Sequence, residues 1–203
     1  CGQGRAGLGR GIAVGGAGSG APAILAAGTE EQKEFFIPGM IRGDIIFALG
    51  CTEPQAGADL AGLQCRAVRD GDDFVINGQK IWTSLAQYAQ WAFVVCRTGD
   101  DSERHHGLSY LLVPMDQPGV EIRPIVQITG GTEFNEVFFD DARVPRENRL
   151  GEEHTVGAAT THFARPVVAL TYAAAYLGIA SGAYELAMEE MVRRHPSGAR
   201  RLD

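Results

Sequence analysis

Between residues 45 and 150 the sequence consists of one strand-like segment after another, with no helical segment between them. Short apolar runs such as DIIFALG, QWAFVVC and GLSYLLV are separated by polar stretches. Strands that follow one another directly pair as antiparallel neighbours, because a parallel pair needs a long crossover that is usually a helix. The sequence therefore predicts an antiparallel β-barrel or sandwich of roughly six to eight strands, from Leu49 to about Leu150.

Two dipeptides within LQCRAVRDGDDFVINGQKIWTS indicate hairpin turns. Asp70-Gly71 is expected to form the first turn. Asn77-Gly78 is the strongest short hairpin signal in the chain, because both residues tolerate the positive φ angles of a type I′ turn. We therefore expect two successive hairpins in this stretch.

Helical segments are expected on both sides of the strands. The N-terminal stretch GIAVGGAGSGAPAILAAG predicts a closely packed helix of small residues. A second helix should begin with Thr29 as its N-cap and be interrupted by Pro38. Its buried side is predicted to carry four apolar residues, Phe35, Phe36, Met40 and Ile41.

A long helix is expected after the strands, starting near Pro166 and ending before Pro196. The fold class is therefore α+β, with an antiparallel β-barrel or sandwich as the middle domain and α-helical segments on each side. The expected domains are residues 1–46, 47–152 and 153–203.

Composition and charge exclude several classes of function. The formal net charge of −7 argues against nucleic-acid binding, which requires a clustered basic face. No run of about 18 apolar residues occurs, so no transmembrane helix is expected. The four cysteines and five histidines lack metal-site spacing, so no metal is expected, and the thiols should be reduced in a cytoplasmic protein. The chain starts at Cys1 rather than Met, which suggests a fragment.

The literal GxGxxG motif at residues 2–7 is not expected to bind a dinucleotide. That fingerprint requires a preceding strand, and only Cys1 stands before it. A close-packed helix explains the glycines better.

The stretch GCTEPQAGADL, residues 50–60, is the first candidate for a ligand-binding loop. Glu53 and Asp59 flank a Pro-Gly bend, where carboxylates more often bond backbone amides than act as acid and base. We therefore expect structural roles for both acids. The backbone amides of Gly57 and Ala58 could face an anion or the edge of a heteroaromatic ring.

The second candidate is KIWTS, in which Trp82 is followed by the hydroxyls of Thr83 and Ser84. A planar cofactor needs an aromatic wall and a few placed polar groups. The alternative is that Trp82 belongs to the barrel core and the hydroxyls face water.

Several motifs, taken in order, resemble the acyl-CoA dehydrogenases, which are flavoproteins of acyl-CoA oxidation. CTEPQAGADLAGL resembles the family's TEPxAGSDxxxL loop, and FVINGQKIWTS resembles its INGxKxWITN segment. EVFFDDARVPRENRLG is similar to the strand that closes the family's middle β-domain, and THFARPVVAL to the first C-terminal helix. GTEEQKEFFIPGMIRGD looks like the end of the N-terminal helical domain, so the resemblance covers essentially the whole chain.

The resemblance implies an FAD cofactor and α,β-desaturation of an acyl-CoA thioester. A glutamate of the family removes the α-proton, and a hydride passes to flavin N5. Thr52 is the expected hydrogen-bonding side chain, Trp82 should flank the flavin ring, and Thr83 and Ser84 should reach its N5/O4 edge. The implied flavin contacts are Leu49, Gly50, Cys51, Thr52, Gly57, Ala58, Trp82, Thr83 and Ser84, and the implied substrate contacts are Ala58, His162 and Arg165.

Some positions depart from the family pattern. Ala58 stands in place of a common Ser, Leu85 in place of Asn, and His162 in place of Asp. Ala164 occupies the position where a minority of the family carries the catalytic glutamate. The base is therefore expected beyond Asp203, and the isolated chain is expected to bind FAD poorly and to lack turnover.

The implied partners are the acyl-CoA substrate and an electron-transferring flavoprotein, with a homo-oligomer, dimer or tetramer, at full length. Other possibilities are an acyl-CoA oxidase or a flavin monooxygenase of the same fold. A non-catalytic subunit that pairs with an active partner is a further alternative, because Ala164 cannot act as a base.

Overall fold

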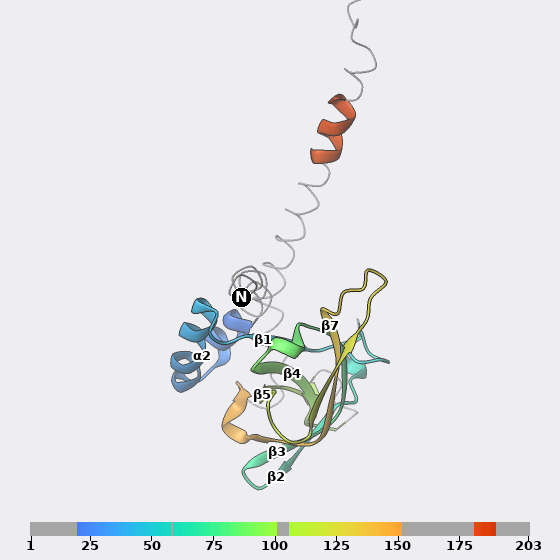
Figure 1. Cartoon of the computed structure of the whole chain (residues 1–203). Coiled ribbons are helices and arrows are strands. Elements are labelled where there is room, and N and C mark those ends of the chain that lie inside the picture. Colours follow the sequence, from blue (N-terminus) through green and yellow to red (C-terminus); the bar gives the residue numbers. More distant parts are fainter. Residues whose placement is uncertain (1–19, 58, 101–105, 152–180, 190–203) are drawn as a thin grey trace, which may run out of the picture. The chain divides into compact units, whose positions relative to one another are not determined.

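The computed structural model describes residues 20–57, 59–100, 106–151 and 181–189. The chain divides into two units, Cys1–Ala164 and Arg165–Asp203. The first unit contains helical and β-structure (Figure 1). In the second unit, residues 181–189 form a helix whose Tyr184 and Leu186 are exposed. The rest of the long helix expected from Pro166 to Pro196 lies outside the described residues.

Helix α2 spans Glu30–Arg42 and begins as expected at Thr29. Thr29 Oγ1 accepts from Gln32 N at 3.2 Å, and Gln32 Oε1 accepts from Thr29 N at 3.1 Å, which forms a capping box. The helix ends at Gly43 in the left-handed conformation.

The predicted buried side of α2 is half correct. Phe36 and Met40 are buried, whereas Phe35 and Ile41 are exposed, because residues one position apart point about 100° apart around a helix. Pro38 does not interrupt the helix, which continues through it to Arg42. None of the described helices is long and apolar enough to cross a membrane.

Eight strands form the sheet among the described residues, which confirms the α+β class with a large β-domain. The neighbour order is β6-β7-β3-β2-β4-β5-β8, and β1 pairs separately with β4. The strands are β1 (Phe47–Gly50), β2 (Arg66–Asp70), β3 (Asp73–Ser84), β4 (Trp91–Arg97), β5 (Leu108–Pro114), β6 (Val120–Ile125), β7 (Phe134–Pro145) and β8 (Arg149–Leu150). Single 3-10 turns occur at η1 (Leu60–Gly62), η2 (Ala86–Tyr88) and η4 (Arg146–Asn148).

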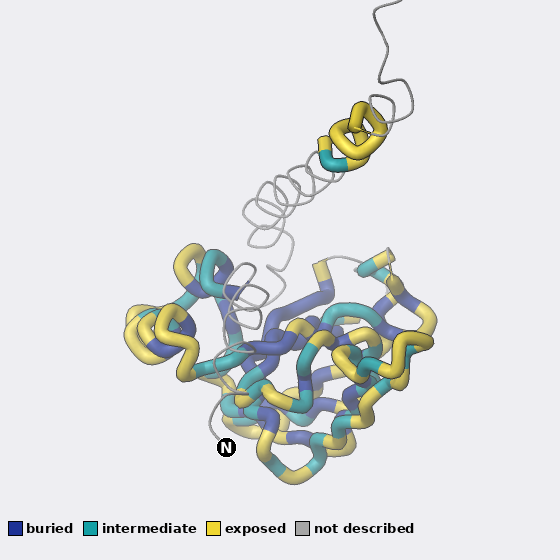
Figure 2. Tube along the Cα trace, turned by 45° about the horizontal axis from the view of Figure 1, so that its top comes forward, coloured by how far each residue is buried: buried dark blue, intermediate teal, exposed yellow. Residues whose placement is uncertain are grey.

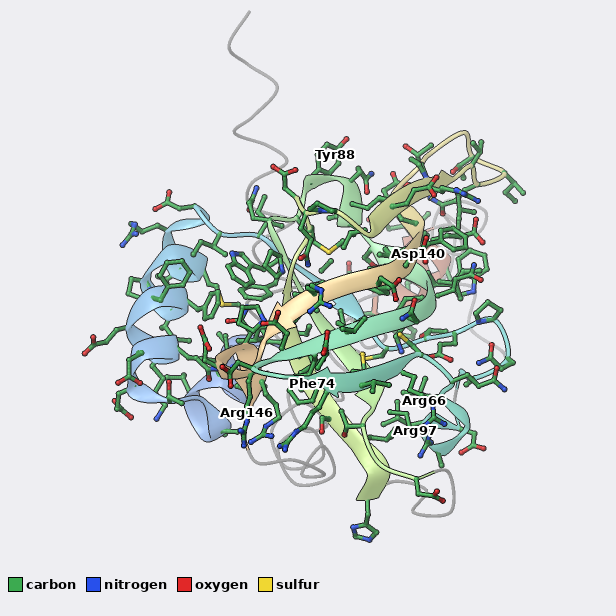
Figure 3. All side chains as sticks on the ribbon, turned by 90° about the horizontal axis from the view of Figure 1, so that it is seen from below. Arg66, Phe74, Tyr88, Arg97, Asp140 and Arg146 are labelled. Carbon is green, nitrogen blue, oxygen red and sulfur yellow. The ribbon has the colours of Figure 1, made fainter. Side chains whose placement is uncertain are left out.

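The sheet is not wholly antiparallel. Strand β1 runs parallel to β4, and β2 meets β4 in parallel at a single pair, Arg66 and Arg97, which lie side by side in Figure 3. The hairpin β2–β3 lies between β1 and β4 in the chain, and this crossover allows β1 and β4 to run in the same direction. All other pairings are antiparallel.

Two hydrophobic clusters explain the two kinds of strand in the sequence. Figure 2 colours the buried residues of the β-domain dark blue along the chain. Strands β4 and β5 are buried on both faces, so they read as continuous apolar runs. On β4, Val94 faces one cluster, inside the curled sheet, while Phe93 faces the second, under α2. Strands β3 and β7 cover only the first cluster and accordingly alternate.

The first predicted hairpin exists, but its two-residue loop is Gly71-Asp72, one residue later than expected. The second prediction is wrong, because Asn77 and Gly78 lie inside the single long strand β3. Gly78 has φ 143°, and a Cβ there would lie 2.7 Å from Cys65 Cα. Glycine therefore serves close packing at this position and not a turn.

Two β-bulges interrupt the β3–β7 pairing. Ile76 pairs with Ala142 but Gly78 with Phe139, so β7 has one extra residue there, next to Asp141 at φ 52°. Lys80 pairs with Val137 but Thr83 with Asn135, so β3 has one extra residue at the second bulge. That bulge contains Trp82, at φ 58°. The two insertions cancel, and the register is the same before the first bulge and after the second.

Candidate functional site

The loop after β1 folds into a tight bend built around Glu53. Glu53 N donates to Ala56 O at 2.9 Å, and Ala56 N donates back to Glu53 O at 3.1 Å. The Glu53 carboxylate is buried and accepts from Gln64 N at 2.7 Å, Cys65 N at 3.0 Å and Gln55 Nε2 at 2.7 Å. The expected structural role of this acid is confirmed.

Asp59 also has the expected structural role. Its Oδ1 accepts from Ala61 N at 3.2 Å and caps the turn η1. Asp59 therefore lies at the C-terminal end of the bend, where its side chain bonds a backbone amide two residues further on.

Lys80 holds this loop to strand β3. Its Nζ donates to Glu53 Oε1 at 2.7 Å and lies 3.4 Å from Cys51 O, and its side chain is fully buried. The sequence offered one signal for this contact, a lysine on the buried side of an alternating strand, and that signal was missed. A buried lysine requires a partner such as Glu53, because an unpaired charge in the interior is costly.

The loop and the end of β3 meet directly. Ile81 N donates to Thr52 O at 2.9 Å, and Ile81 lies in the second bulge directly before Trp82. The two sequence segments singled out as candidates are therefore joined by a backbone bond and by the Lys80 ammonium. Non-glycine residues with a positive φ angle are strained and concentrate at functional sites. Trp82 is such a residue, with φ 58°.

Trp82 is not part of the barrel core. The residue is 53% exposed, and its ring meets Phe134 edge-on with centroids 6.1 Å apart. The core alternative for Trp82 is therefore wrong. Leu49 on β1 and Ser84 on β3 are exposed as well, so the two strands expose an aliphatic chain, an indole and a hydroxyl.

The remaining predicted flavin residues differ in accessibility. Cys51 and Thr52 are half-buried, Gly50 is buried and Gly57 is exposed. Thr83 is buried, and its Oγ1 has no hydrogen-bond partner among the described residues, so the hydroxyl is not on the surface that Trp82 and Ser84 share. Ala58, His162 and Arg165, together with Ala164, lie outside the described residues.

The thiol of Cys51 is close to the phenol of Tyr110, with 3.6 Å between Sγ and Oη. Burial raises the pKa of Cys51, and burial raises the pKa of Tyr110 well above its ordinary value. Both groups are therefore protonated near neutral pH, and Cys51 is not an activated nucleophile there.

A cavity of about 880 Å³ lies elsewhere in the first unit, between α2 and residues 146–151. Phe35, Phe36 and Trp91 line one part of it, and Arg146, labelled in Figure 3, lines another. None of the predicted flavin residues that the structure describes lines this cavity. In the described ranges, no group of three or more His, Cys, Asp or Glu side chains is placed to bind a metal.

Residues 48–142 match the family model for the acyl-CoA dehydrogenase middle domain. This range covers the sheet from β1 into β7, together with both joined segments of the candidate site. The fold and the match define the β-domain as an acyl-CoA dehydrogenase middle domain. The chain belongs to the acyl-CoA dehydrogenase family.

Individual relatives agree with this assignment. The chain is 48% identical over 184 residues to acyl-CoA dehydrogenase IpdE1 of Mycobacterium tuberculosis, a match that covers 89% of this chain and 48% of IpdE1. It is 45% identical, with a TM-score of 0.66, to a chain of the ChsE4–ChsE5 complex from the same organism, covering 70% and 36% of the two chains. It is 33% identical, with a TM-score of 0.58, to a glutaryl-CoA dehydrogenase of Mycobacterium smegmatis in complex with FADH2, covering 64% and 33%. The chain spans about half the length of the curated relatives it matches.

Proposed function

We propose that this chain supplies the flavin-binding middle domain of an FAD-dependent acyl-CoA dehydrogenase. The observation that carries the proposal is the junction of the loop after β1 with the bulge of β3, through Ile81 N–Thr52 O and Lys80. It presents the exposed indole of Trp82 on a segment that is fixed at both ends. A glutaryl-CoA dehydrogenase that is 33% identical is known in complex with FADH2, which supports a flavin as the ligand.

The residues present fit an isoalloxazine ring. Trp82 offers an aromatic wall, Leu49 an apolar contact, and Ser84 an exposed hydroxyl that can donate to a ring edge. Thr52, whose carbonyl is already bonded to Ile81 N, keeps its side-chain hydroxyl for a ligand. Bound FAD would supply the hydride acceptor for oxidation of an acyl-CoA.

The domain assignment extends this proposal to the whole chain. We assign residues 1–46 to an N-terminal helical domain, 47–152 to the β-domain and 153–203 to the start of a C-terminal helical domain. The full-length protein would desaturate an acyl-CoA in the cytoplasm and pass electrons to an electron-transferring flavoprotein. We assign the catalytic base to a residue beyond Asp203, so the isolated chain should bind FAD weakly and show no turnover.

The oligomer has two candidate forms. The family resemblance favours a homo-oligomer at full length, whereas a 45% identical neighbour belongs to a complex of two different chains, ChsE4 and ChsE5. In the second form this chain could be a partner subunit that lacks its own base. Co-purification of the full-length protein with a second acyl-CoA dehydrogenase chain would favour the second form.

Flavin affinity tests the proposal. In the full-length protein, Trp82→Ala should lower the affinity for FAD about tenfold, which corresponds to about 1.4 kcal/mol. Trp91→Phe is the matched control, because Trp91 packs against Phe36 under α2 with ring centroids 4.9 Å apart, and its affinity should change less than about twofold. Unchanged FAD affinity after Trp82→Ala would overturn the proposed flavin site.

A further inference from the structure

We infer that Asn135 is a positioning residue that holds the segment with Trp82 and Ser84 in its ligand-facing conformation. This inference rests on the proposed flavin site. Asn135 lies on β7 opposite Thr83, is fully buried, and shares no surface with a ligand. It therefore acts through the backbone of the neighbouring strand.

The amide of Asn135 joins three parts of the structure. Its Nδ2 donates to Thr83 O at 3.0 Å and to Gln87 Oε1 at 2.6 Å, and lies 3.5 Å from Glu133 O. All three neighbours are acceptors, so the NH₂ group must point this way. The amide bonds therefore reach both the strand residue after Trp82 and the turn η2.

The same turn is fixed by two further bonds to the segment before β7. Leu85 N donates to Glu133 O at 2.6 Å, and Gln87 Nε2 donates to Thr132 O at 2.8 Å. The side chain of Gln87 therefore accepts from Asn135 and donates to Thr132 O in the β6–β7 connection. Residues 83–87 are held by residues 132–135 along their whole length.

This segment needs an external clamp because its backbone is strained. Trp82 has φ 58° and Leu85 has φ 56°, and each such non-glycine residue costs about 1–3 kcal/mol. Strain of this size persists only where the surroundings determine the conformation. Asn135 binds the carbonyl of Thr83, which lies between the two strained residues.

Packing alone does not account for an asparagine at this position. Asn135 Oδ1 and Thr83 Oγ1 are both buried and without a hydrogen-bond partner among the described residues. Each such atom costs about 1–3 kcal/mol. An apolar side chain would avoid this cost at position 135 but would lose the bond to Thr83 O. We therefore attribute the choice of asparagine at position 135 to the bond from its side chain to Thr83 O, which fixes the conformation of β3.

The first test follows Trp82 without any cofactor. The chain has two tryptophans, so Trp91→Phe leaves Trp82 as the only indole emitter in the 203-residue chain. In that background, Asn135→Asp replaces the donating NH₂ by a carboxylate that faces three acceptors. We expect a shifted emission maximum and lower anisotropy for Trp82, and acidification that protonates the carboxylate should reverse both changes.

The matched control is Asn77→Asp at the other bulge of the same strand pair. Asn77 Nδ2 donates to Asp141 Oδ1 at 2.9 Å, so this variant disturbs β3 and β7 without contact to the Trp82 segment. We expect it to lower stability and to leave Trp82 emission unchanged. Equal emission changes in both variants would reduce Asn135 to a general stability role and overturn the inference.

A second readout is the flavin of the full-length protein. Asn135→Asp should lower FAD affinity about fivefold or more and shift the visible spectrum of the bound flavin, and Asn77→Asp should do neither. If Trp82→Ala weakens FAD binding and Asn135→Asp does not, the inference fails and the proposed function stands. If Asn135→Asp changes Trp82 emission, but neither Trp82→Ala nor Asn135→Asp changes the affinity for FAD, the inferred clamp stands and the flavin assignment fails.

Discussion

Glu53 and Lys80 form an ion pair in the interior of the β-domain, with 2.7 Å between Oε1 and Nζ and at most 2% of either side chain exposed. The pair connects the loop after β1 to the middle of β3. Backbone amides of Gln64 and Cys65 occupy further lone pairs of the carboxylate. A buried pair of this kind is costly to break, because removal of one partner leaves the other charge uncompensated.

We predict that Glu53→Gln lowers the free energy of unfolding by about 3–5 kcal/mol, since Lys80 is left as an unpaired buried charge. Urea denaturation of the chain measures this change. The double variant Glu53→Gln/Lys80→Met should lose less stability than Glu53→Gln alone, because it buries no unpaired charge.

Asp44→Asn is the matched carboxylate-to-amide control. Asp44 pairs with Arg42 at 2.6 Å on the surface, where both side chains are more than half exposed. Its effect should be below about 1 kcal/mol. A similar loss for Asp44→Asn and Glu53→Gln would show that the burial of the Glu53–Lys80 pair is unimportant.

Gly78→Ala should destabilise the chain by about 3 kcal/mol or more. The new Cβ would lie 2.7 Å from Cys65 Cα, which is backbone and cannot move aside, and the residue would keep a φ of 143°. Gly71→Ala has a positive φ of 65° but open space around its Cβ, so it should cost only about 1–2 kcal/mol. Thermal unfolding of both variants checks the prediction, and a smaller loss for Gly78→Ala than for Gly71→Ala would contradict it.

Alkaline pH should destabilise the fold through Tyr110. Burial raises the pKa of this phenol well above its unfolded value of about 10. The unfolded chain therefore releases its proton first, so the contribution of Tyr110 is complete below pH 10 and is lost as pH rises towards the folded pKa. Tyr110→Phe should flatten the fall in unfolding free energy above about pH 10. Tyr88→Phe, at an exposed tyrosine of η2, is the control, and an equal flattening there would refute the assignment.

Gln32→Ala should cost more stability than Thr29→Ala. Thr29→Ala removes the N-cap of α2, a loss of about 1 kcal/mol. Gln32 contributes to the same capping box and also donates to Glu147 O at 2.7 Å and Arg149 O at 3.1 Å, which anchors α2 to the end of the β-domain. Chemical denaturation should therefore give a loss of about 2 kcal/mol for Gln32→Ala, and equal losses would argue against the anchor.

Local signals predicted much of the fold. Apolar runs identified the strands, because β4 and β5 are buried on both faces and read as continuous hydrophobic segments. Thr29 was identified as a helix start because capping depends on residues within one turn. Asn77-Gly78 led to a wrong hairpin prediction. Glycine is typical of hairpin turns, but Gly78 is needed here beside a bulge, where the backbone of Cys65 comes close.

Long-range relations could not be predicted in this way. The parallel pairing of β1 with β4 joins residues more than forty positions apart, such as Phe47 and Trp91, and no local pattern encodes it. Lys80 and Asn135 were missed for the same reason, because each acquires its role from partners distant in the sequence. The resemblance to a family identified the segments around Thr52 and Trp82, and the structure adds the bonds that connect them.

The two bulges of β3 and β7 shift the pairing register of the strands by one residue and then restore it. Only Gly78, Gln79 and Lys80 lie within the shifted window, and Lys80 turns inward there to meet Glu53. Deleting the extra residue at either bulge would remove that bulge and leave the residue pairs on both sides of it, with their inner and outer faces, unchanged. Deleting the extra residue at the second bulge would let β3 alternate regularly through Thr83 and would erase the bend at Trp82, so one deletion separates the scaffold from its ligand-facing segment.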